Sequence, residues 1–169
     1  MGVRNRRWVP TLVTLVGIVL AVGFVGAAAI GGAFYWDRVA LRGEQAARAE
    51  LPQLAAEQLP RMYTYDYQTV ERTHNEIYPL LTPTFREEFK QLIEQRGIIS
   101  QARERQVVSQ AHVVGVGVMQ ASRSAASVLV YLNHTTTDKS KEPVYQGSRV
   151  RVDYKKVDGK WLIDNVTPI

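Results

Sequence analysis

Apolar and polar positions divide the chain into a long uncharged run and a mixed remainder. No charged residue occurs between Arg7 and Asp37, and residues 8–36 are almost all apolar or small. A helix needs about 20 such residues to cross the hydrocarbon core of a membrane, so this run predicts a transmembrane helix. A cleaved signal peptide has an apolar region of only about 7–15 residues, and we therefore expect an uncleaved anchor.

The residues that flank this run predict its orientation. Arg4, Arg6 and Arg7 precede it, and positively charged flanks stay on the cytoplasmic side of a membrane. We expect a single-pass protein of the plasma membrane, with residues 1–7 in the cytoplasm and the C-terminal domain outside it.

Helical patterns continue after residue 36. Residues 37–62 are rich in Ala, Glu, Gln, Leu and Arg, which favour helices, and should form a stalk and the first helix of the outer domain. Pro52 and Pro60 should kink or restart this helix. Its mostly apolar stripe comprises Leu51, Leu54, Ala55, Gln58, Leu59 and Met62.

Two more helices are expected in residues 63–169, the rest of the extracytoplasmic domain. Asp66 fits the N-cap of the first helix, and His74 falls on its apolar face. Thr82 fits the N-cap of the second, with proline at the first helical position, and Gly97 should bend that helix. Its expected buried side comprises Phe85, Phe89, Leu92 and Ile93.

From residue 106 onward the apolar period changes to two, which is typical of strands. Strict alternation in the first strand places Val114 on the face opposite to Met119. Asp158–Gly159 is a strong signal for a two-residue hairpin, which sets Tyr154 opposite Ile163. The four expected strands are 106–120, 126–138, 148–157 and 160–166. The elements together predict an α+β fold, with about three helices packed on a curved, mostly antiparallel four-stranded sheet.

Composition and charge exclude several kinds of site. The chain has no cysteine, so disulfides and thiolate metal sites are excluded. The net charge is +5, from 21 Lys+Arg and 16 Asp+Glu. Three of the positive charges precede the apolar run, which leaves 21 − 3 = 18 basic against 16 acidic residues in the outer part. This near balance, without a basic cluster, argues against nucleic-acid binding.

An acid–base catalytic site is the most specific chemical function that the sequence suggests. Asp66 lies between Tyr65 and Tyr67, with His74 shortly after them, and an Asp base with a Tyr donor can transfer protons in a cone-shaped pocket. A catalytic base needs a free carboxylate near the substrate proton, whereas a capping carboxylate is already engaged. We therefore expect no enzyme activity from this stretch.

The histidines give no metal motif. His74, His112 and His134 are scattered along the chain, without the spacing that metal ligands share. We expect each to be a satisfied or half-buried side chain, and neither a metal nor a cofactor is predicted.

A ridge of small residues lies in the predicted membrane helix. Gly23, Ala27 and Gly31 recur every four residues, and such a ridge lets two membrane helices approach closely. We predict that a partner helix packs on these three residues, although membrane helices are rich in glycine in any case.

Several stretches resemble one known family over nearly the whole chain. They are Tyr65–Asp66–Tyr67, LTPTFREEF at 81–89, YLNHTTTD at 131–138 and the closing residues 147–169. The chain is similar there to the Mce-associated membrane proteins of mycobacteria and related actinobacteria. This resemblance implies a cone-shaped domain like nuclear transport factor 2 and ketosteroid isomerase. It also implies an accessory role in Mce complexes, which carry lipids across the envelope, and it supplies no catalytic residues.

The favoured function is therefore a non-catalytic, membrane-anchored scaffold that stabilises or assembles an Mce-type lipid-import complex. Its expected partners are Mce transporter subunits and the lipid bilayer. The alternatives are a scaffold of another envelope machine, such as type IV secretion, and a cone that binds a lipid or small ligand or acts like an isomerase.

Overall fold

The computed structural model describes residues 8–140 and 142–169, and for most residues between 8 and 40 it describes only the backbone. The chain divides into two compact units, Met1–Leu41 and Arg42–Ile169. In the part of the chain described, no helix combines the length and the apolar character that a membrane span requires. The predicted anchor at 8–36 is helical, but most of its side chains lie outside the described residues, as does the predicted cytoplasmic segment 1–7.

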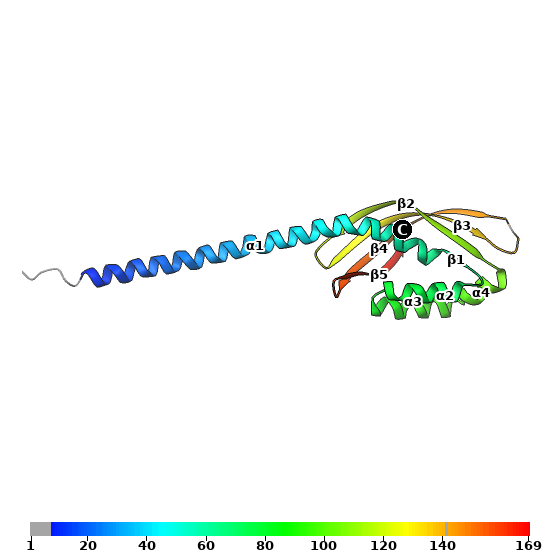
Figure 1. Ribbon diagram of the computed structural model, residues 1–169, viewed down its shortest axis with the longest axis horizontal. Coiled ribbons are helices and arrows are strands. Elements are labelled where there is room, and N and C mark those ends of the chain that lie inside the picture. Colours follow the sequence, from blue (N-terminus) through cyan, green and yellow to red (C-terminus); the bar gives the residue numbers. More distant parts are fainter. Residues whose placement is uncertain (1–7, 141) are drawn as a thin grey trace, which may run out of the picture. The chain divides into compact units, whose positions relative to one another are not determined.

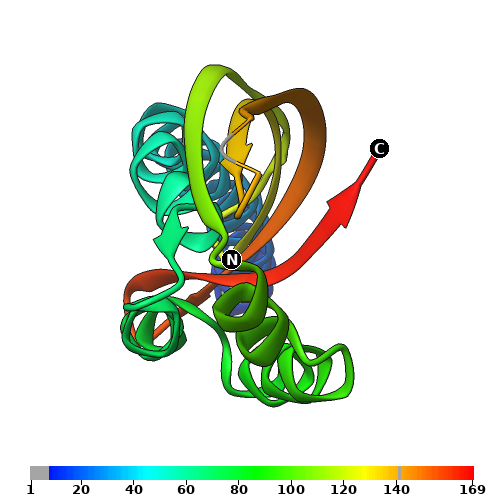
Figure 2. The same cartoon turned by 90° about the vertical axis from the view of Figure 1, so that its right-hand side faces the viewer.

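The second unit is an α+β domain, as the sequence predicts, with one strand more than expected (Figure 1). Its sheet is antiparallel throughout, and its strand order, β1-β2-β3-β4-β5, follows the sequence. Figure 2 shows that the sheet is strongly curved and that β5 lies between the other long strands and the short helices. The elements are α1 (Trp8–Tyr63), β1 (Tyr65–Asp66), α2 (Val70–Ile77), the 3-10 helix η1 (Tyr78–Leu80), α3 (Pro83–Gln95), α4 (Ile98–Arg105), β2 (Val108–Ala121), β3 (Ala125–Thr137), β4 (Val144–Val157) and β5 (Lys160–Pro168).

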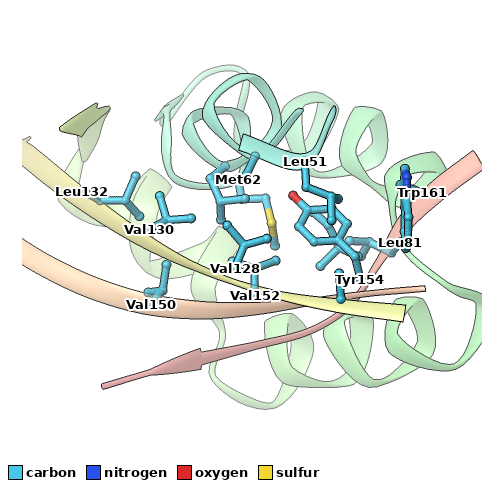
Figure 3. Close-up of a cluster of buried hydrophobic side chains, with 14 of the residues drawn as sticks. Leu51, Met62, Leu81, Val128, Val130, Leu132, Val150, Val152, Tyr154 and Trp161 are labelled. Atoms are coloured by element: carbon cyan, nitrogen blue, oxygen red, sulfur yellow. The ribbon is translucent and has the colours of Figure 1, made fainter. Parts of the chain in front are cut away.

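The core forms between the last turns of α1 and the inner face of the sheet (Figure 3). Leu51, Ala55 and Leu59 of α1 are fully buried there, which confirms the predicted stripe. The indole Nε1 of Trp161 also donates to a carboxylate oxygen of Glu50 at 3.1 Å, which ties β5 to α1. The sheet contributes Ala126, Val128, Val130, Leu132, Val150, Val152, Tyr154, Trp161 and Ile163 to this core.

The prolines of α1 do not interrupt it, so the predicted restart is wrong, whereas a kink at either proline stays a prediction. α1 continues through Pro52 and Pro60 to Tyr63. A proline removes a hydrogen bond and crowds the preceding turn, but helix stability in a folded domain comes mainly from packing of the apolar face. The buried stripe on either side of both prolines holds the helix in place.

The predicted ends of several elements are confirmed. Thr82 caps α3, because its Oγ1 accepts a hydrogen bond from the Phe85 N–H. The helix that was expected to bend at Gly97 instead ends before it, and Gly97 separates α3 from α4 in a left-handed conformation, with φ of 57°. The hairpin at Asp158–Gly159 pairs Tyr154 with Ile163. On α3, however, Leu92 is 37% exposed, and its predicted place on the buried side is wrong.

The predicted strict alternation of β2 is also wrong, because the strand is irregular in two places. Register shifts occur between Val113 and Gly115 and between Val118 and Gln120. Each shift leaves one residue of β2 without a partner on β3, as in a β-bulge. Val113 and Val116 both pack against the core. An odd-numbered residue therefore faces inward before the first bulge, and an even-numbered residue faces inward after it.

Candidate functional site

The stretch around Asp66 forms a strand and a turn, so the prediction that Asp66 caps a helix is wrong. Tyr65 and Asp66 pair with Ser109 and Val108 as the short strand β1. Asp66 Oδ1 accepts the Gln68 N–H at 2.8 Å, which is the bond of an Asx turn. α2 begins later, at Val70, without a side-chain cap. The carboxylate is thus engaged by the backbone, as expected, but in a different local structure.

His74 is a buried structural residue. Its side chain is 3% exposed, and Nδ1 lies 2.7 Å from the Val70 carbonyl oxygen, which can only accept, so Nδ1 carries the proton. The ring stacks on Phe89 with centroids 6.0 Å apart, and it lies 6.1 Å from the ring of Tyr65. The structure therefore brings Tyr65 and His74 together as packing partners and confirms that His74 is satisfied.

The other two histidines differ from each other. His134 is half-buried with its ring edge against Tyr63, at a centroid distance of 5.1 Å, and burial lowers its pKa. His112 is exposed rather than half-buried. In the parts of the chain that the structure describes, no three His, Asp or Glu side chains gather as a metal site would require.

The space inside the curved sheet is occupied by the domain's own side chains. Tyr154 is 1% exposed and packs among Leu51 and the inner valines of β3 and β4 (Figure 3). Its hydroxyl has no hydrogen-bond partner, and neither has the side-chain oxygen of Gln58. Burial raises the pKa of Tyr154. This interior is a packed core with two unpaired polar atoms.

Besides a smaller cleft of about 310 Å³ between the end of α1 and α2, two larger clefts lie at the surface of the domain. One, of about 490 Å³, extends from Arg48 to the β2–β3 turn and includes Met119. The other, of about 580 Å³, lies between α4 and the β3–β4 hairpin and includes the ion pair of Arg105 with Asp138. Tyr65 lines the larger cleft, but Asp66, Tyr67 and His74 line none of these clefts, so the acid–base candidates are not gathered around one cavity.

The outer face of β4 carries a network of charged side chains. Arg151 donates to both carboxylate oxygens of Asp153 at 3.0 Å, and Ser127 also donates to Asp153. Burial raises the pKa of Asp153, but the bonds from Arg151 and Ser127 outweigh it and lower the pKa overall. Lys155 pairs with Asp164, which accepts a hydrogen bond from the Thr82 hydroxyl. This network holds β3, β4, β5 and α3 together.

Large apolar side chains are exposed at the edge of the sheet. Val114 is 65% and Met119 is 50% exposed, and these are the two residues that the bulges leave unpaired on β2. The pattern of the sequence did not predict either side chain at the surface. The glycines at 115 and 117 were the available signal, because glycine inside a strand often marks a bulge.

The predicted helix-packing residues lie in the first unit. Gly23 is exposed, and a Cβ added to it would meet no atom within 4 Å. The surroundings of Ala27 and Gly31 fall outside the described residues. Their role in packing a partner helix therefore stays a prediction.

Comparison with known proteins relates this chain to a mycobacterial one. No protein-family model matches it. The Mycobacterium tuberculosis protein named outer membrane protein Rv1973 is 30% identical over 138 residues, which cover 82% of this chain and 86% of the relative. The chain belongs to the family of that protein. A shorter match, 38% identical over 69 residues, covers 40% of this chain and 31% of the uncharacterized protein Rv1362c of the same species.

Solved structures share the fold of the domain. The periplasmic domain of DotI gives a TM-score of 0.63 at 14% identity, over 72% of this chain and 94% of that one. An IcmL-like type IV secretion system protein from Legionella pneumophila gives 0.62 at 15% identity, over 72% and 93%. VirB8 of Agrobacterium tumefaciens gives 0.52 at 12% identity, over 67% and 85%. Helices packed on a curved antiparallel sheet are thus common to these proteins and this chain.

Proposed function

We propose that this protein is a non-catalytic accessory subunit of the cell envelope, anchored in the plasma membrane by residues 8–36, that stabilises or assembles an Mce-type lipid-import complex. Its C-terminal domain would lie outside the cytoplasm, and its partners would be the transporter subunits and the bilayer. The proposal rests on the filled interior of the domain.

A filled interior favours a protein that acts through its surface. Ligand sites in proteins are concave and mostly apolar, with a few convergent polar groups. Here the concave side of the sheet is covered by the stripe of α1, and Leu51, Leu59 and Tyr154 are almost completely buried. A carrier of lipid inside the cone would have to displace this core. The same packing disfavours an isomerase-like pocket.

The comparisons support the envelope part of the proposal. The relative that defines the family is named an outer membrane protein, and the structure of DotI that shares the fold is that of a periplasmic domain. The Mce assignment has a different support, which is the resemblance of Tyr65–Asp66–Tyr67, 131–138 and 147–169 to Mce-associated proteins.

A second candidate is a scaffold of a secretion-type envelope machine. The observation that favours it is the fold shared with the IcmL-like type IV secretion system protein of Legionella pneumophila. At 15% identity this likeness extends to the fold alone, and we rank the candidate second.

One experiment separates the candidates. The full-length tagged protein is purified from its own cells in a gentle detergent, and the proteins and lipids that co-purify are identified by mass spectrometry. Mce subunits should be enriched over a purification from cells without the tag. Enrichment of secretion components would select the second candidate, and stoichiometric lipid without protein partners would favour a carrier. Recovery of the protein alone in every detergent would reject a scaffold role.

A further inference from the structure

Strand β2 has a long edge without a backbone partner. β1 pairs only with Val108 and Ser109, and the Ala111 N–H is bound by the Thr64 hydroxyl at 3.0 Å. From His112 to Ala121, all described residues, no backbone hydrogen bond is made on the side away from β3. This edge can therefore accept another strand.

The edge lacks the usual chemical protection against strand addition. Natural edges are commonly protected by lysine, by proline or by inward-pointing charges, yet residues 106–122 contain neither a charged residue nor a proline. The two bulges are what protects this edge from strand addition. They leave Gly115–Val118 as the stretch between them with regular strand geometry. A strand added here would pair over about four residues.

The side chains around this short stretch favour contact with apolar groups. Val114 and Met119, one at each end, are 65% and 50% exposed. Between them, a Cβ added to Gly115 or Gly117 would meet no atom within 4 Å. The backbone is thus open on the glycine face, and the two apolar residues are placed to cover an incoming strand from both ends.

We propose that the edge from Val114 to Met119 pairs antiparallel with the same edge of a second copy of this chain. Residues directly opposite each other in an antiparallel pair share a face of the sheet. A two-fold arrangement therefore places valine opposite valine on the inner face and glycine opposite glycine on the outer one. It continues the sheet and the apolar inner layer from one copy to the next.

Charge also favours a second copy as the occupant. The outer part is close to charge balance, with 18 basic against 16 acidic residues, so two copies repel each other only where like-charged side chains face one another. The uncharged stretch 106–122 is a place where like charges do not oppose each other across the junction. It also offers no charge with which to select a charged partner. The surface thus fits an identical neutral edge better than a charged segment of another protein.

The pairing should be weak and dependent on concentration. Stable interfaces bury about 1,200–2,000 Å², and a four-residue ladder with two flanking side chains provides less. Copies held together in one complex would meet at a high effective concentration, where a weak contact suffices.

Disulfide trapping tests the pairing directly, because the chain has no cysteine of its own. Gly115→Cys and Gly117→Cys are made in the full-length protein and oxidised singly and as a mixture. Opposed residues of an antiparallel pair have Cα atoms about 4.5–5.5 Å apart, which suits a disulfide. Gly147→Cys is the matched control, because Gly147 is an exposed glycine on β4. We expect one of the edge samples to cross-link at least about tenfold faster than the control, and the sample that does so reports the register.

A second variant tests the same edge without cysteine chemistry. The double substitution Val114→Lys and Met119→Lys places charges on both copies, and Val144→Lys, at a site 63% exposed, is the control. Sedimentation velocity in detergent should show self-association weakened at least about tenfold, a factor that corresponds to 1.4 kcal/mol, with an unchanged thermal unfolding temperature. Equal cross-linking at edge and control, persistent self-association of the lysine variant, or cross-links only to a different protein would each overturn the proposal. Recovery of transporter subunits in the purification described above is independent of all three.

Discussion

At the scale of single residues, the buried hydroxyl of Tyr154 shows that the core is not fully optimised. The oxygen has no hydrogen-bond partner, and leaving a buried polar group unpaired costs about 1–3 kcal/mol. Tyr154→Phe should therefore leave the free energy of unfolding unchanged or raise it by about 1 kcal/mol in urea titrations. Tyr145→Phe, at a site 76% exposed, should have no effect. A loss of stability in Tyr154→Phe would mean that the hydroxyl has a partner.

The same hydroxyl should make the domain sensitive to alkali. Burial raises the pKa of Tyr154 above its ordinary value of 10.0, so above about pH 10 the unfolded chain loses a proton that the folded chain keeps. The unfolded state is then favoured as the pH rises. In the wild type, urea titrations at rising pH should show a steeper loss of stability above pH 10 than in Tyr154→Phe.

Substitutions of Asp66 can separate a structural role of its carboxylate from a catalytic one. Its Oδ1 accepts the Gln68 N–H, and Asn keeps such an oxygen whereas Ala does not. Asp66→Asn should be close to the wild type in unfolding free energy, and Asp66→Ala should lose about 0.5–1.5 kcal/mol. Co-purification with partners should follow stability in both. A stable Asp66→Asn protein without function would contradict the structural role and revive the acid–base interpretation.

At the scale of elements, the β4–β5 hairpin depends on the conformation of its turn. Gly159 has φ of 81°, and no atom lies within 4 Å of an added Cβ. Gly159→Ala should therefore cost about 1–2 kcal/mol through backbone strain alone, as measured by chemical unfolding. Gly117→Ala, in equally open space but without a positive φ, should stay within about 0.5 kcal/mol of the wild type. Equal losses in both variants would show that strain at the turn is not the cause.

The elements that the sequence predicted well are those with a strong local signal. The Asp158–Gly159 turn and the Thr82 cap each depend on a few adjacent residues, and both are confirmed. β1 was missed because two residues, Tyr65 and Asp66, carry no periodicity and form a strand only through pairing with β2. The bulges of β2 were missed for the same reason, since register is set by the neighbouring strand. The exposure of Val114 and Met119 follows from those bulges, so it could not be predicted from the sequence pattern either.

At the scale of the whole molecule, the proposed partner contact within the membrane can be separated from folding. Gly23 and Gly31 lie outside the domain Arg42–Ile169, and small residues permit close helix contact in lipid. The double substitution Gly23→Leu and Gly31→Leu should weaken co-purification with partner subunits by about tenfold, which corresponds to 1.4 kcal/mol. Thermal unfolding of the domain should not change. Undiminished co-purification would remove these glycines from the contact.

The sequential order of the strands has a consequence for how the domain is made. Each strand pairs with the one that precedes it in the chain, so the sheet can grow hairpin by hairpin as the polypeptide emerges. The stripe of α1 is synthesised before any of the strands that cover it, and Trp161 and Ile163, which complete the core, come last. For most of synthesis the nascent chain therefore presents an uncovered apolar helix. This interval of biogenesis, before β5 is added, is when the chain is most exposed to aggregation and proteolysis.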